Sequence, residues 1–178
     1  MSEIVNVLAL VCAEDVLAKY GPNDGEGDPV VLGEDYGGLI VAAAYGGGQA
    51  RFDLAITAPR GTSAAPTLVR WRACTLSMDA AYQCEIEKLT ISAQADCLQA
   101  ATSQNKSFDL CLADVEAPQD PSKLTTESVV DRYWESQINS AGTASYLVDI
   151  KITDHKGTVQ GHYRIGSSAT GQPTVRIS

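Results

Sequence analysis

A period-two alternation of apolar and polar residues is the sequence feature that most constrains how this chain folds. It is clearest in residues 68–82, where Val69 and Trp71 fall on one face of an expected strand and Arg70 and Arg72 fall on the other. The stretch therefore predicts a strand, a polar bend and the start of a second strand. We interpret it structurally: Trp71 fills a core, and the two arginines border a solvated face.

Similar strand patterns recur along the chain between short turn signals. The run at 4–12 is nearly continuous and apolar, as in a buried strand, whereas the runs at 51–57, 108–115 and 159–165 alternate. Within residues 82–91 the apolar positions change phase, which predicts a β-bulge or bend in that strand. No internal repeat or linker divides the sequence, so we expect one domain over residues 1–178.

The segments between these runs are mostly turns. The glycine triplet at 46–48 predicts a hairpin turn, and residues 154–157 predict another. The Ala- and Gln-rich stretch 92–103 is the best candidate for a short helix, and residues 14–20 have weaker helical character. Together these signals predict an all-β fold, an antiparallel β-sandwich or jelly roll of about nine strands with one short helix.

Charge and composition exclude several classes of partner. The chain of 178 residues has a net charge of −9 and a pI of about 4.6. An acidic surface repels phosphate backbones and anionic lipids, so we expect neither nucleic acid nor a membrane as a partner. The apolar run near the N-terminus is too short to span a bilayer and follows no basic segment, which favours a cytoplasmic location.

Residues for catalysis or metal binding are sparse in the sequence. The two histidines, His155 and His162, lie in one expected hairpin, and no GxSxG or HExxH motif occurs. The five cysteines include no CxxC pair, so neither a zinc site nor a disulfide framework is predicted. The acidic loop 21–29 lacks EF-hand spacing. We therefore expect no enzyme activity, no cofactor and no metal.

Several short blocks resemble the bacterial inclusion-body protein family, also called the PixA/AidA family. The blocks are residues 2–8, Asp35-Tyr36, Val69-Arg70-Trp71-Arg72 with 75–77 and Tyr82, Tyr133-Trp134, Gly142, Tyr146, 154–157 and 161–163. The chain departs from the family pattern at Gly37-Gly38, where a further aromatic is usual, and at 165–168, where the family has a Trp-Asp-Pro block. If those aromatics line a shared pocket, that pocket is altered in this chain.

The resemblance implies a non-catalytic bacterial protein of the cytoplasm that acts by self-assembly or partner binding. It also implies growth-phase or quorum-sensing control and a connection to host interaction. For self-association we expect a homodimer, since a sandwich has edge strands that can pair with another copy. The alternatives are a lectin-like module that binds a glycan or small molecule and an enzyme of unrecognised type. For a binding module, the candidate residues are Tyr36, Arg70, Arg72 and Tyr163.

Overall fold

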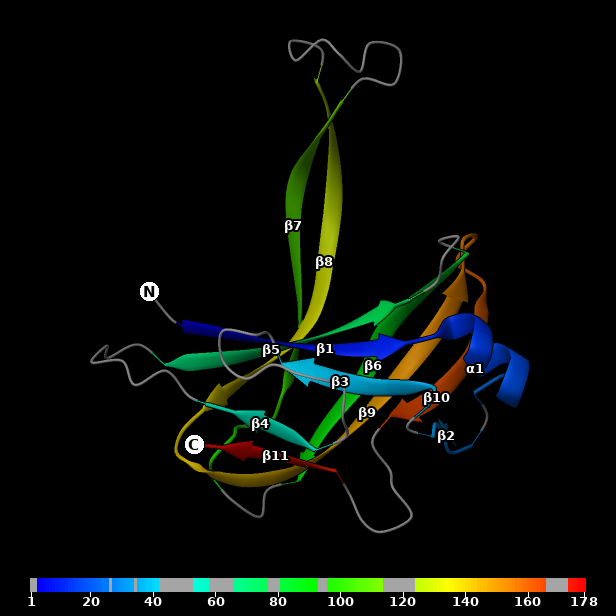
Figure 1. Ribbon diagram of the computed structural model, residues 1–178. Coiled ribbons are helices and arrows are strands. Elements are labelled where there is room, and N and C mark those ends of the chain that lie inside the picture. Colours follow the sequence, from blue (N-terminus) through cyan, green and yellow to red (C-terminus); the bar gives the residue numbers. More distant parts are fainter. Residues whose placement is uncertain are drawn as a thin grey trace.

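The computed structural model describes residues 3–25, 27–33, 35–41, 53–57, 66–76, 81–92, 96–113, 124–165 and 173–178 (Figure 1). Within these residues the chain forms eleven strands and one helix. The all-β prediction is confirmed. The predicted turn at 46–48 lies outside the described residues.

The strands form two mixed sheets. One runs in the order β3 (Gly37–Val41), β1 (Glu3–Val11), β5 (Thr67–Thr75), β8 (Leu124–Ile138) and β7 (Thr102–Ala113). The other runs in the order β2 (Val30–Val31), β10 (Val159–Ile165), β9 (Gly142–Asp154), β11 (Thr174–Ile177) and β4 (Leu54–Ile56), with β6 (Tyr82–Ser92) also pairing with β9. Six pairings are antiparallel, as predicted, and three are parallel: β1 with β5, β2 with β10, and β4 with β11.

The helix lies at the weaker of the two helix candidates in the sequence. The expected helix at 92–103 is wrong: Ser92 ends β6, Thr102 begins β7, and Leu98 between them forms a bridge with Ile138. Helix propensity there is outweighed by burial of Leu98 and its neighbour Cys97. The observed helix, α1 (Ala13–Tyr20), buries Ala13 and Val16. No described helix has the length and apolar character needed to cross a membrane.

The core lies between the two sheets and contains Trp71. Alternate side chains of β1 and β9 point into it. Trp71 is fully buried, its ring centroid lies 5.6 Å from that of Tyr146 on the opposite sheet, and its indole N–H donates to Ser136 Oγ at 3.1 Å. The structural interpretation of Trp71 is therefore confirmed. The predicted bulge is also confirmed, because the β6–β9 register shifts between Ile86 and Lys88.

The five-stranded sheet forks at Trp71. Strand β5 pairs with β8 only from Thr67 opposite Ile138 to Trp71 opposite Trp134. Beyond that pair β5 continues beside β1, whereas β8 continues with β7 as a two-stranded hairpin that projects from the molecule (Figure 1). We call residues 105–113 of β7 and 124–132 of β8 the arm. The fork sets the position of the candidate site.

Candidate functional site

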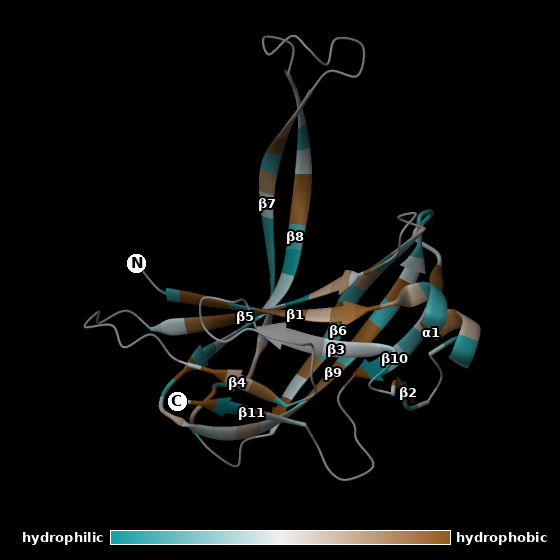
Figure 2. Ribbon diagram, in the orientation of Figure 1, coloured by the Kyte–Doolittle hydropathy of each residue, from teal (hydrophilic) through white to brown (hydrophobic). Residues whose placement is uncertain are grey.

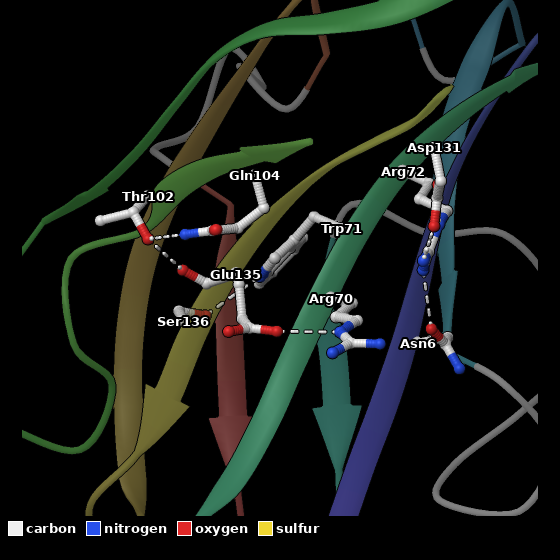
Figure 3. Close-up of polar contacts among 9 residues, drawn as sticks. All are labelled: Asn6, Arg70, Trp71, Arg72, Thr102, Gln104, Asp131, Glu135 and Ser136. Atoms are coloured by element: carbon white, nitrogen blue, oxygen red, sulfur yellow. Dashed lines mark hydrogen bonds and ion pairs between the residues drawn. The ribbon is translucent and has the colours of Figure 1, made fainter. Parts of the chain in front are cut away.

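The two arginines of β5 lie on the outer face of the five-stranded sheet and are held by carboxylates of β8. Arg70 Nε donates to Glu135 Oε2 at 2.8 Å (Figure 3). Arg72 makes a two-pronged contact with Asp131 at 3.0 and 2.7 Å. Both guanidinium groups also lie 4.8 Å from the centre of the Tyr133 ring. These contacts neutralise both cations and brace β8 where it leaves β5.

Asn6 on β1 completes this network. Its Oδ1 accepts a hydrogen bond from Arg72 at 2.9 Å (Figure 3). The hydrogen bonds from Arg72 hold the pKa of Asp131 below its ordinary value, because they favour the charged carboxylate. The chemistry of the cluster is therefore that of a structural ion-pair network across three strands, in which Nε of Arg70 and all three nitrogens of the Arg72 guanidinium are engaged.

The structure does not bring the four candidate binding residues together. Arg70 and Arg72 are neighbours, but Tyr163 lies on β10 of the other sheet, fully buried, with its hydroxyl donating to Gly21 O at 2.6 Å. Tyr36 precedes β3 and packs edge-on against Tyr20, with ring centroids 5.4 Å apart. Tyr163 thus lacks the exposure that the sequence suggested, and a binding role for the set remains a prediction.

The arm exposes large apolar side chains. Because directly opposed residues share a face, Phe108 lies beside Val129 and Leu110 beside Glu127 on the outer face. Phe108 is 42% exposed, Leu110 is 40% exposed, and Val130 on the other face is 50% exposed. Figure 2 shows hydrophobic segments alternating with hydrophilic ones along the projecting strands β7 and β8. Half of the exposed large apolar residues of the described chain therefore lie on the arm.

The arm also has unpaired backbone edges. Strand β7 ends the five-stranded sheet, so no other described strand pairs with its outer edge. Among the described strands, β7 alone pairs with β8 between residues 124 and 133. A two-stranded ribbon is marginally stable on its own, and unpaired edges readily accept another strand.

A polar groove lies under the arm, inside the fork. It has a volume of about 660 Å³, and its lining includes Gln83, Glu85, Asn105, Arg132 and Trp134. The Trp134 indole donates to Ile86 O at 3.0 Å, and Arg132 contacts Glu85 at 2.9 Å, so these side chains tie β8 to β6 across the two sheets. The groove combines hydrogen-bonding groups with an aromatic ring, as sites for small polar ligands do.

Further ion pairs involve Glu85 and Glu87, two acidic residues that line the groove. Glu85 also contacts Lys151, and the two cations help to hold its pKa below the ordinary value against the opposing effect of burial. His162 Nδ1 lies 2.7 Å from Glu87 Oε2. Among the residues that the structure describes, no group of three or more His, Cys, Asp or Glu side chains could hold a metal ion.

The arm was missed in the sequence analysis, although part of its signal was visible. The alternation through Phe108 and Leu110 predicted a strand but not whether its apolar face is covered. The polar stretch from Thr102 to Ser107 gave no strand signal, so the predicted strand began at 108 rather than 102. Strand β8 begins at Leu124, within a largely polar stretch that precedes the apolar pair Val129-Val130.

Comparison with known proteins identifies a matching family and a similar solved structure. A family model described as PixA, inclusion body protein, matches residues 3–168. The crystal structure of an inclusion body protein (PixA) from Burkholderia cenocepacia J2315 superposes with a TM-score of 0.69 at 12% sequence identity, covering 99% of this chain and 97% of that one. Comparison with curated protein sequences gives no match. At this identity the structural likeness establishes the shared fold.

Proposed function

This chain belongs to the PixA family of inclusion body proteins, and from that premise we propose that it functions by self-assembly, with the arm as the contact surface. The observation that carries the proposal is a projecting β-hairpin with exposed Phe108, Leu110 and Val130 and an unpaired outer edge. Exposed apolar side chains that cluster on one element indicate a protein-binding surface. A ribbon of two strands gains stability when further strands pair with it.

Charge neither favours nor opposes the arm as the contact surface. The arm has two basic residues, Lys106 and Arg132, and three acidic ones, Asp109, Glu127 and Asp131, so its charge per residue matches that of the whole chain. The exposed apolar side chains and the unpaired edge therefore carry the proposal, against a repulsion between copies that acts over the whole surface. We expect association to increase as pH falls toward the pI, because the remaining repulsion then fades.

The family is not a known enzyme family. Within the same proposal the protein is non-catalytic and accumulates in the bacterial cytoplasm, under growth-phase or quorum-sensing control and in connection with host interaction. The support for these parts is the family resemblance alone. They concern when and where the protein is used, whereas the arm concerns how copies meet.

Light scattering over a range of protein concentration and pH tests the proposal. The wild-type chain should form a dimer or larger species, and Phe108→Ser combined with Leu110→Ser should shift it toward monomer. Val159→Ser is the matched control, because Val159 is 44% exposed but lies on β10 of the other sheet. A wild-type chain that stays monomeric at every concentration and pH would contradict the proposal.

The groove supports a second candidate function, binding of a glycan or small polar molecule. Its volume of about 660 Å³ lies within the range typical of ligand sites. Amide, carboxylate and guanidinium groups beside the Trp134 ring suit a ligand rich in hydroxyl groups. A glycan array probed with and without calcium tests this candidate, and an array without any binding would remove it.

A further inference from the structure

We propose that two copies of this chain pair through the outer edges of β7, antiparallel and about a two-fold axis at Phe108, so that the two five-stranded sheets become continuous. This inference rests on the proposed self-assembly and specifies its geometry. The edge is suited to a second copy because β7 carries one lysine and one aspartate and is therefore uncharged overall. Edge strands of this kind pair readily with an identical strand.

Symmetry and charge together select the register. In a two-fold antiparallel pair, the residue on the axis faces its own copy, and residues equally far from it on either side face each other. An axis at Lys106 would place two lysines opposite each other, and an axis at Asp109 would place two aspartates opposite each other. Opposed like charges destabilise a strand pair. The central positions that remain are Ser107 and Phe108.

Apolar contact favours Phe108 over Ser107. With the axis at Phe108, its ring faces the same ring of the other copy, and Val129 flanks it on β8 within each chain. A continuous apolar row, Val129-Phe108-Phe108-Val129, then crosses four strands. With the axis at Ser107, Phe108 would instead face Lys106. Aromatic pairs across strands are more stabilising than that combination.

The same axis places polar groups opposite one another on the other face. Ser107 faces Asp109 of the other copy, where the hydroxyl can donate to the carboxylate. Asn105 faces Cys111 of the other copy, and both side chains are exposed in the single chain. The register therefore joins the two apolar rows and places each charge of β7 opposite a neutral residue of the other copy.

Disulfide trapping tests this register directly. Directly opposed residues in antiparallel strands have Cα atoms about 4.5–5.5 Å apart, within the range that a disulfide bridges. Asn105→Cys should therefore form a covalent dimer with native Cys111 under mild oxidation, seen on a non-reducing gel and mapped by mass spectrometry. Within one chain these two positions lie about 20 Å apart along the strand, so they cannot bridge intramolecularly.

Ser103→Cys is the matched control. Ser103 lies on the same face of β7 and would face Cys111 only if the axis were at Ser107. Both variants are made in a Cys74→Ser background, because Cys74 is also exposed, and circular dichroism verifies their fold. We expect a strong dimer band for Asn105→Cys and background levels for Ser103→Cys and for the chain with Cys111 alone.

The outcomes separate this inference from the proposed function. A stronger dimer band for Ser103→Cys than for Asn105→Cys would overturn the register at Phe108. If neither variant cross-links but light scattering shows association that requires Phe108 and Leu110, the pairing of β7 edges is wrong and arm-mediated assembly stands. If the wild-type chain shows no association by light scattering, both fail.

Discussion

The two halves of β8 experience different environments within one strand. From Trp134 to Ile138 the strand pairs with β5 on one side. On its other side it pairs with the start of β7 and, through Ile138, with Leu98, which precedes β7. Its inward side chains pack under the second sheet. From residue 124 to 132 it pairs with β7 alone, and most of its described side chains are exposed. Local sequence is strand-forming in both halves. What differs is whether a second sheet covers the apolar face.

This comparison separates side chains that stabilise the chain from side chains that are available to a partner. The side chains of Trp71 and Tyr146 are fully buried within one molecule, whereas those of Phe108 and Leu110 keep much of their exposure there. Burial of apolar area stabilises wherever it occurs, within a chain or between chains. We call the described residues outside the arm the body. Mutations in the body should therefore change the free energy of unfolding, and mutations in the arm should change association.

The largest expected effect is that of Trp71→Ala in the body. Loss of a fully buried Trp should lower the free energy of unfolding by about 3–5 kcal/mol. Ser136 Oγ would also lose its indole donor. Urea denaturation measures the change, with Phe108→Ala on the arm as the comparison, expected within about 0.5 kcal/mol of wild type. If the two substitutions lowered the free energy of unfolding equally, the distinction between body and arm would be wrong.

The junction between the two regions should show an intermediate effect. Trp134→Phe removes the indole N–H that donates to Ile86 O while keeping an aromatic ring in place. We expect the free energy of unfolding to fall by about 1 kcal/mol, the typical contribution of one such hydrogen bond. Urea denaturation measures it. An unchanged midpoint would mean that the contact between β8 and β6 does not stabilise the fork.

The ion pair at the base of the arm should make stability depend on acid pH. Arg72 keeps the pKa of Asp131 below its ordinary value of about 4. The folded state therefore gains stability above about pH 4 and loses it as pH falls through the lowered pKa. Asp131→Asn should cost about 1 kcal/mol at neutral pH and lose this cost in acid.

Denaturation curves at a series of pH values measure this dependence. Glu127→Gln is the control, since it removes an exposed carboxylate from the same strand further out on the arm. The free energy of unfolding of this variant should depend on pH in the same way as that of the wild type. If Asp131→Asn is as stable as wild type at neutral pH, the pair with Arg72 does not brace the junction.

The smallest effect concerns thiol reactivity and needs no substitution. Burial raises the pKa of Cys84 to about 12, so this partly exposed thiol in the wall of the groove should react slowly with thiol reagents, and buried Cys97 should react only after unfolding. Cys111 on the arm is exposed and should react in the folded chain. If copies pair through β7, labelling of Cys111 should slow as protein concentration rises. A rate independent of concentration would argue against coverage of this edge.

Much of the fold followed from local pattern, and the misses have physical causes. The alternation around Trp71 predicted a buried indole, and the phase change within 82–91 predicted the bulge, because side-chain direction in a strand has a period of two. The two-residue β2 is too short for any periodicity to appear. The stretch 92–103 was assigned to a helix on residue propensity, which tertiary burial of Cys97 and Leu98 overrides.

The candidate site was much less predictable. The sequence pointed to Tyr36, Arg70, Arg72 and Tyr163 because aromatic and cationic residues often bind ligands. Only tertiary structure shows that carboxylates from β8 neutralise both arginines, and that Tyr163 faces the core. Those carboxylates are more than fifty residues from the arginines in the chain, so no local pattern could join them.

The sequence by itself determined that the chain is all-β, where most strands lie and which face of each strand is apolar, because these depend on residues two positions apart. Tertiary structure alone decided which apolar faces are covered. Coverage depends on where β5 and β8 part and on which strands of the second sheet reach over them. The row through Phe108 and the row through Trp71 are alike as sequence patterns. They differ because Trp71 lies on the face of the five-stranded sheet that the second sheet covers, whereas Phe108 lies on the outer face.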